Sequence, residues 1–375
     1  MRLFEHHDFE QLVLLAAEHF RPRGLRPAIL EKDYYVTEAL RIIAAAGEPI
    51  IFKGGTSLSK GWNLIDRFSE DIDIFLDPRA YDPPLGKRAI DRELKKLRDA
   101  VAEHPALTFV KDESQTIGGF GRNDRFSYHQ LFGGPGEVAN RVLLEAGTAS
   151  GREPTTVIEL RSYLSEFLAA QGLSMGADDE GPFPMRLLHF RRTFVEKMFA
   201  IHSKIEIFKR DGTPLGTYAR HYYDLVKLAE RGDVIAMLNS PEYAAIKADY
   251  DAISREYFPG SYFWPADMSF ANSDALFPPE QLGGLIGPLS TKSSAGNCAT
   301  AHIRHGLTSR PHSTDFAIFY SMRAGLAHVK LNAAFTMETA LRHGKRTRSI
   351  EVCGLMRSTI QRPSRGESSW RWQGR

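Results

Sequence analysis

The chain has 375 residues, of which 42% are hydrophobic and 25% charged, and its 48 lysines and arginines nearly balance 46 aspartates and glutamates. This composition excludes a largely disordered chain, and the length suits two compact units of roughly 100–200 residues each. No uncharged apolar run approaches the roughly 18–20 residues that span a bilayer, and the first residues lack the apolar core of a secretory signal. Two cysteines cannot build a disulfide framework. We therefore expect a cytoplasmic protein with no membrane partner.

The small net charge of +2 conceals two segments of opposite charge. Residues 297–375 carry 13 lysines and arginines but 4 acidic residues, a balance of +9, which leaves −7 for residues 1–296. A basic tail is typical of nucleic-acid binding. It is also what a fused or frame-shifted extension, or a divergent helical end, would show. These three interpretations of the tail stay open.

The predicted elements begin with two helices and two short strands. Apolar residues at helical spacing indicate helices over about 9–20 and 27–45. The apolar run at 50–52 predicts a strand, which leads through a Gly-Gly-Thr-Ser turn into a short helix that ends near residue 64. A second strand is expected over Asp71–Leu76. A charged helix over 87–104 follows, and then strands near 107–111, 125–131, 139–146 and 155–160.

The second half of the chain is predicted to be mainly helical. Residues 171–184, QGLSMGADDEGPFP, are the clearest linker, and helical spacing predicts helices near 190–209, 217–231 and 241–254. We therefore predict an α+β fold with a mixed sheet and flanking helices, followed by a helical domain. The expected divisions are an N-terminal α/β unit at 1–170, the linker at 171–184, the helical domain at 185–290 and an atypical, poorly ordered basic tail at 291–375.

A strand, a Gly-Gly-Thr-Ser turn and a helix in succession form a phosphate-binding arrangement. Glycine lets the backbone approach a phosphate closely, and the free N–H groups of the following helix point toward it. We therefore predict that Gly54, Gly55, Thr56 and Ser57 bind phosphates. The spacing differs from that of a P-loop and from that of a dinucleotide-binding fingerprint.

Asp71 and Asp73 occupy alternate positions of a predicted strand, so both carboxylates lie on one face while Ile72 and Ile74 face the core. Two like charges this close are unfavourable unless a cation neutralises them. Mg²⁺ prefers one or two carboxylates together with substrate phosphates and water. We therefore predict that the two aspartates bind Mg²⁺ or Mn²⁺ and that an NTP is the substrate. The alternative is an acidic pair on a solvated strand edge.

Several motifs in one order give the chain a resemblance to the AbiEii/AbiGii-type toxins, which have the nucleotidyltransferase fold of the DNA-polymerase-β-like superfamily. The run KGGTSLSKGWNLIDRFSEDIDIF at 53–75 resembles the family's Gly-Gly turn followed by Asp-x-Asp. EKDYYV at 31–36 is similar to the family's EKDYWV, and TFVEK at 193–197 and RHYYDL at 220–225 extend the match. The resemblance runs from about residue 10 to about residue 285.

Three positions depart from the patterns that carry the resemblance. Thr56 replaces the serine of the superfamily's Gly-Ser turn, and the spacer before Asp71 is longer than in the polymerase-type pattern. Both departures are usual within the toxin family. Tyr35 replaces the usual tryptophan, which is a conservative change.

The resemblance implies further site residues. Lys197, which shares a helix face with Thr193, would stabilise the triphosphate in the transition state. A third strand often supplies a third carboxylate in this fold, and Glu145 is the candidate; the alternative is a strand-end charge. Asp224 is predicted to be a catalytic residue, with a carboxylate that holds an arginine as the alternative. Arg67 is expected to brace the aspartates or contact a phosphate rather than form a surface ion pair.

The roles of other polar residues in these motifs are less specific. Residues 31–33 either line the cleft or begin a helix, where acidic residues favour the N-terminal dipole. His202 and His221 are expected to be packed or hydrogen-bonded in helices, because no His/Cys spacing typical of zinc is present.

The resemblance implies a Mg²⁺-dependent nucleotidyltransferase toxin of a toxin–antitoxin or phage-defence system. It would transfer NMP from an NTP to an RNA acceptor, with tRNA as the expected acceptor, release pyrophosphate, and have its antitoxin encoded nearby. Two alternatives stay open: a small-molecule nucleotidyltransferase of the antibiotic-modifying kind, and a nucleotide-binding regulatory protein without turnover. The acidic balance of residues 1–296 does not itself indicate a nucleic-acid groove, although local basic clusters would supply one.

Overall fold

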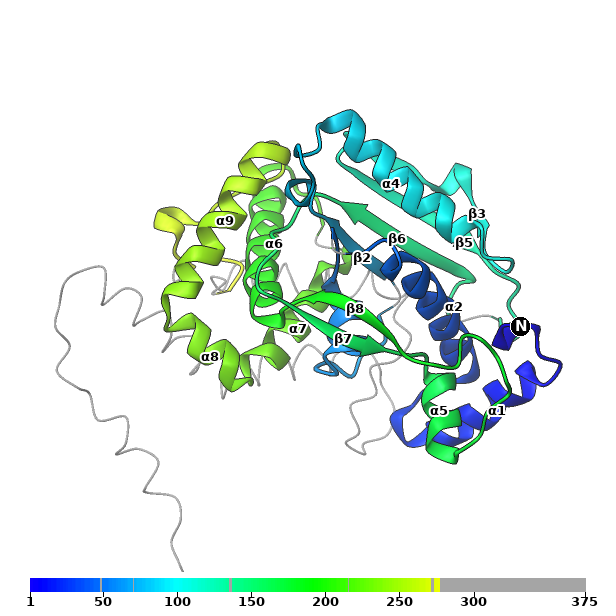
Figure 1. Cartoon of the computed structure of the whole chain (residues 1–375). Coiled ribbons are helices and arrows are strands. Elements are labelled where there is room, and N and C mark those ends of the chain that lie inside the picture. The colour runs from blue at the N-terminus through cyan, green and yellow to red at the C-terminus, as the bar shows by residue number, and fades with distance from the viewer. Residues whose placement is uncertain (48, 70, 135–136, 215, 271–272, 277–375) are drawn as a thin grey trace, which may run out of the picture.

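A mixed sheet with helices against one face and a separate group of helices beside it makes up the computed structural model (Figure 1). The structure describes residues 1–276 except residues 48, 70, 135–136, 215 and 271–272. The predicted α+β class with a mixed sheet is confirmed. The predicted basic tail at 291–375 and the last part of the predicted helical domain lie outside the described residues. No helix in the described part of the chain is long and apolar enough to cross a membrane.

Strand β2 lies in the middle of the sheet, with three strands on either side along the order β3-β5-β6-β2-β1-β8-β7. It runs antiparallel to β1 and parallel to β6, and β1 runs parallel to β8. The short strand β4 extends the β5 edge. The strands are β1 (Ile50–Lys53), β2 (Asp71–Leu76), β3 (Thr108–Phe109), β4 (Gln115–Ile117), β5 (Gly121–Ser127), β6 (Arg141–Gly147), β7 (Thr155–Leu160) and β8 (Phe183–Leu188).

The inner face of the sheet is covered by α2 (Pro27–Ala44) and α4 (Lys87–Ala102). Helix α4 is charged, as predicted, but buries one apolar stripe at spacings of three and four residues, which is the pattern of a helix that lies on a sheet. That stripe consists of Ile90, Leu94, Leu97 and Val101. Helices α1 (Phe9–His19) and α5 (Tyr163–Gln171) pack beside α2, so the N-terminal helices belong to the same core.

The charged run at the start of α2 holds distant loops in place. The carboxylate of Glu31 accepts hydrogen bonds from the backbone N–H groups of Leu131 and Phe132, at 2.7 and 3.0 Å. Asp33 pairs with Lys60 at 2.8 Å and accepts from the backbone N–H of residue 163 at 2.9 Å. Both carboxylates are buried, so these contacts satisfy groups that would otherwise destabilise the core.

The remaining helices form a second apolar cluster around the long helix α6 (Phe190–Asp211). It packs against α7 (Ala219–Ala229), α8 (Gly232–Leu238) and α9 (Pro241–Tyr257), seen on the left of Figure 1. Large buried side chains such as Phe194, Phe199 and Phe270 fill its centre. The predicted helices near 190–209, 217–231 and 241–254 thus correspond to α6, α7 and α9.

Three strands differ from the sequence-based expectation, and one of them, β4, has no predicted counterpart. Strand β5 begins at residue 121, whereas the sequence predicted a start near 125. The prediction missed the first half of the strand because this half buries the ion pair of Arg122 and Asp124 instead of apolar side chains. Strand β8 covers the end of the predicted linker and joins the sheet beside β1. Its buried residues Phe183, Met185 and Leu187 alternate with Pro184 and Arg186, a short period-two pattern that the proline obscured.

Candidate active site

The turn after β1 is shaped by contact with β2. Gly54 has a φ of +78°, a left-handed conformation that favours glycine, and a Cβ at this position would overlap the carboxylate of Asp73. A Cβ on Gly55 would lie 2.5 Å from a terminal nitrogen of Arg67 and 2.9 Å from the hydroxyl of Ser69. Both glycines are therefore needed so that the turn can lie directly against charged and polar groups of the site.

The hydroxyls of the turn are engaged within the protein. Thr56 donates to the backbone carbonyl of Asp71 at 2.6 Å and lies 3.0 Å from the Ser69 hydroxyl. Ser57 donates to the carbonyl of Gly54 at 2.9 Å, and both side chains are buried. Thr56 thus fixes the turn to β2 and Ser57 bonds within the turn, so the backbone of the turn, rather than these hydroxyls, is the part that remains for a phosphate.

Three carboxylates lie on one face of the central strands, opposite the face of Ile72 and Ile74. The register pairs Asp73 with Glu145 on β6, and Asp71 lies two residues before Asp73 on the same face. Ile72 and Ile74 are buried on the opposite face, as the alternation predicted. Glu145 therefore stands directly beside the aspartate pair.

The electrostatics of this group favour a bound cation. Burial, followed by the charge of Asp71, raises the pKa of Asp73, while the Lys53 charge opposes that shift. Burial and the two aspartate charges raise the pKa of Glu145 to about 7. A divalent cation would favour the ionised forms of Asp73 and Glu145, and carboxylate oxygen is the ligand that Mg²⁺ and Mn²⁺ accept. The donor set therefore fits the metal expected from the sequence.

A second group of charges lies behind the glycine turn. Asp224 on α7 is fully buried and accepts two hydrogen bonds from Arg67, at 2.8 Å each, and an ion pair from Lys197 on α6, at 2.9 Å. Burial alone would raise the pKa of Asp224, but the charges and hydrogen bonds of Lys197 and Arg67 lower it to about 2. The carboxylate thus stays ionised and holds both cations in place.

Lys197 has a second partner that the sequence analysis did not identify as part of the site. Its Nζ lies 3.0 Å from Nδ1 of His221. Burial, followed by the nearby Lys197 charge, lowers the pKa of His221 well below its ordinary value, so the ring is neutral and Nδ1 accepts the hydrogen bond. Burial also lowers the pKa of Lys197, against the pull of Asp224.

Arg220 and Lys53 are two further basic residues at the site that sequence reasoning did not find. Arg220 donates to Oδ2 of Asp71 at 2.9 Å. Lys53 is the register partner of Asp73 across β1 and β2. The only sequence signal for Arg220 was its place at the start of the RHYYDL run, and the signal for Lys53 was its place before the glycines.

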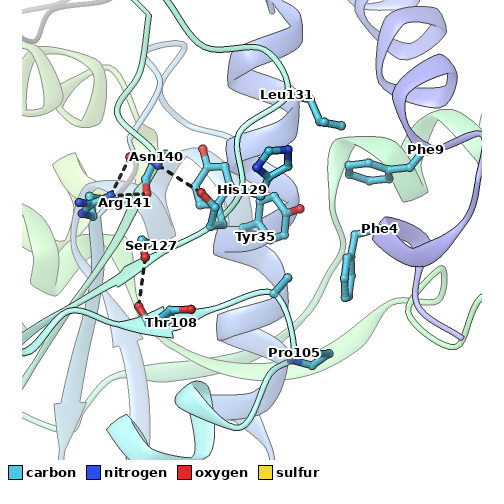
Figure 2. Close-up of a pocket in the computed structure, with 12 residues that line it drawn as sticks. Phe4, Phe9, Tyr35, Pro105, Thr108, Ser127, His129, Leu131, Asn140 and Arg141 are labelled. Carbon is cyan, nitrogen blue, oxygen red and sulfur yellow. Dashed lines mark hydrogen bonds between the residues drawn. The ribbon is translucent and has the colours of Figure 1, made fainter.

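The structure brings the predicted site residues together but places the described cavity elsewhere. A cavity of about 610 Å³ lies near the N-terminal helices, between the aromatic rings of Phe4, Phe9 and Tyr35 on one side and Asn140 and Arg141 on the other (Figure 2). Its lining, within the part of the chain that the structure describes, includes none of the predicted site residues. The candidate active site is therefore identified by its charges and register rather than by an enclosed volume.

The chain is similar to known proteins in two comparisons. The family model described as "Nucleotidyl transferase AbiEii toxin, Type IV TA system" matches residues 38–282, which include every predicted site residue. Among solved structures, a chain from H. pylori described as a candidate nucleotidyltransferase is similar at 16% identity and a TM-score of 0.34, covering 63% of this chain and 83% of that chain. No curated protein matches the sequence.

Proposed function

Because the chain belongs to the AbiEii family of nucleotidyltransferase toxins from type IV toxin–antitoxin systems, we propose that it transfers a nucleoside monophosphate from an NTP to an RNA acceptor. The proposed acceptor is tRNA, and the proposed cofactor is Mg²⁺ or Mn²⁺. We further propose a cytoplasmic setting, with an antitoxin encoded nearby and a role in phage defence. The proposal rests on the close approach of Gly54 to the Asp73 carboxylate and on the pairing of Asp73 with Glu145 across β2 and β6.

The proposed reaction uses these residues in separate roles. Asp71 and Asp73 would hold the metal, which would neutralise phosphate charge when bound. The backbone of the turn at Gly54 and Gly55 supports the β- and γ-phosphates. The acceptor hydroxyl oxygen attacks the α-phosphorus, the bond from that phosphorus to the β-phosphate oxygen breaks, and pyrophosphate leaves. Glu145 would take the hydroxyl proton, and this assignment rests on its position beside Asp73.

Lys197 and Asp224 supply the second half of the proposed machinery. Lys197 carries a positive charge into a buried environment, where it would stabilise charge on the departing pyrophosphate more strongly than in water. Asp224 is proposed to act as a positioning residue, because both of its oxygens are engaged by Arg67 and Lys197. This differs from the direct catalytic role expected from the sequence and matches the alternative considered there.

The proposal is tested by incubating the protein with Mg²⁺, each of the four labelled NTPs and total tRNA. We expect label on tRNA with the wild type and none above background with Lys197→Ala. Label on small hydroxyl compounds alone would instead identify a small-molecule nucleotidyltransferase. Nucleotide binding without transfer to any acceptor would identify a regulatory protein. Glu230→Gln, which changes an exposed charge at the end of α7, is the control and should transfer normally.

A further inference from the structure

Arg220 occupies one of the two oxygens that Asp71 offers to a metal. Its terminal nitrogen donates to Oδ2 of Asp71 at 2.9 Å. The two residues are 149 positions apart, and the contact joins the first turn of α7 to the first residue of β2. Arg220 therefore lies on the proposed metal ligand itself.

The attachment of Arg220 differs from that of Arg67. Arg67 forms two hydrogen bonds with a fully buried carboxylate, and its side chain is 12% exposed. Arg220 forms one hydrogen bond with Asp71, and its side chain is 39% exposed. A bidentate, buried arginine is fixed in one geometry, whereas a singly bonded and partly exposed arginine can turn to another acceptor at small cost.

We propose that Arg220 competes with the divalent cation for Asp71 in the nucleotide-free protein and transfers to the nucleotide phosphates when the metal–nucleotide complex binds. This inference rests on the proposed function. A guanidinium and a divalent cation at the same carboxylate repel each other, so the binding of one weakens the binding of the other. Phosphate oxygens accept a guanidinium at least as well as a carboxylate does, and they arrive together with the metal.

The charges around Asp71 support an exchange of partners. Without a cation, the Arg220 charge offsets part of the repulsion among Asp71, Asp73 and Glu145. When a metal takes over that function, Arg220 is left beside a site that has gained positive charge and a triphosphate. Its favourable position is then on the phosphates that bind beside the metal.

The first test measures Mn²⁺ binding without nucleotide by electron paramagnetic resonance. We expect Arg220→Gln to bind Mn²⁺ about fivefold more tightly than the wild type, because it removes a competing charge. Lys227→Gln is the matched control: it removes a cation from the same helix, but Lys227 contacts the exposed Asp66 at 3.4 Å. The control should change Mn²⁺ affinity less than twofold. Weaker or unchanged binding by Arg220→Gln would overturn the competition, because a fixed support of Asp71 has that effect.

The second test measures nucleotide binding by calorimetry with Ca²⁺ and each of the four ribonucleoside triphosphates. We expect Arg220→Gln to weaken binding of the preferred triphosphate about tenfold, so that one substitution tightens metal binding and loosens nucleotide binding. Arg220→Lys, which keeps the charge but loses the planar fork, should recover part of the affinity. Equal nucleotide affinity in the wild type and Arg220→Gln would refute the transfer to phosphate.

Asp71→Asn separates failure of this inference from failure of the proposed function. If Asp71→Asn loses Mn²⁺ binding while Arg220→Gln matches the wild type, the metal site stands and the role of Arg220 is wrong. If Asp71→Asn and Arg220→Gln both bind Mn²⁺ like the wild type, the metal does not use Asp71, and the inference falls together with the metal assignment.

Discussion

The guanidinium of Arg67 forms two hydrogen bonds of 2.8 Å with the fully buried carboxylate of Asp224. Arg67 lies just before β2 and Asp224 lies on α7, so this pair joins the strand of the aspartates to the helical group. Lys197 shares the same carboxylate. The alignment of the two halves of the proposed site therefore depends on one buried carboxylate.

Replacing Asp224 by Asn should lower the free energy of unfolding by about 3–5 kcal/mol, because it leaves two buried cations without their partner. The side chains of Arg67 and Lys197 are 12% and 7% exposed. Urea unfolding followed by circular dichroism measures the change. Asp66→Asn, at a carboxylate 88% exposed, is the control and should cost less than about 0.5 kcal/mol. A loss below about 1 kcal/mol for Asp224→Asn would show that the pair contributes little to stability.

Asp224 also predicts how stability depends on pH. Its pKa is about 2 in the folded protein against an ordinary 3.8, so the folded state binds this proton less readily than the unfolded chain. The stabilisation is complete above the unfolded pKa and is lost as pH falls toward 2. The unfolding free energies of the wild type and Asp224→Asn should differ by about 1 kcal/mol less at pH 3 than at pH 5. Urea titrations at each pH measure this difference. The same difference in unfolding free energy at pH 3 and pH 5 would contradict the lowered pKa of Asp224.

Gly54→Ala should lower the rate of nucleotidyl transfer by about 100-fold or more, because the added Cβ displaces the Asp73 carboxylate and a shift of about 1 Å in a site has that effect. Gly24→Ala is a close control: its φ of +73° resembles the +78° of Gly54, but a Cβ there meets nothing within 4 Å. It should show backbone strain of about 1–2 kcal/mol and normal transfer. Equal rates for the two variants would mean that the contact with Asp73 is unimportant.

Asp73→Asn should reduce transfer by about a thousandfold, the rate equivalent of several kcal/mol of metal-dependent stabilisation, without loss of stability. Burial and Asp71 raise the pKa of Asp73, so its ionised form is unfavourable in the folded protein above that pKa. The neutral variant should therefore unfold at the same or a higher temperature at pH 7. Transfer assays and calorimetry test both parts. Glu159→Gln, which neutralises an exposed carboxylate on β7, is the control and should change neither the transfer rate nor the unfolding temperature. Full transfer by Asp73→Asn would refute the metal assignment.

The aspartate strand was predictable because its information is local. The alternation of acidic and apolar residues over residues 71–74 specifies both the strand and its two faces. In the structure Ile72 and Ile74 are buried on one face and the aspartates lie on the other. Glu145 was identified by resemblance to a fold in which a third strand contributes a carboxylate. Its register opposite Asp73 depends on a pairing between strands that are far apart in the sequence.

The contacts of Arg220 and His221 were not predictable from pattern alone. Both lie on α7, and their partners come from β2 and α6, so their roles are set by how the helical group docks on the sheet. Strand β5 was partly missed for a related reason. The buried Arg122–Asp124 pair replaces the apolar residues by which a strand is recognised, and its stability comes from tertiary contacts.

The place of β2 in the middle of the sheet has a consequence for how the protein loses function on heating. Three strands protect it on each side, so the backbone that carries Asp71 and Asp73 cannot fray from an edge and opens only when the whole sheet melts. Amide protons near these residues should then be among the slowest to exchange with deuterium. Heat inactivation that precedes the melting of the sheet would then come from undocking of the helical group, which carries Lys197 and Asp224, and not from fraying of β2.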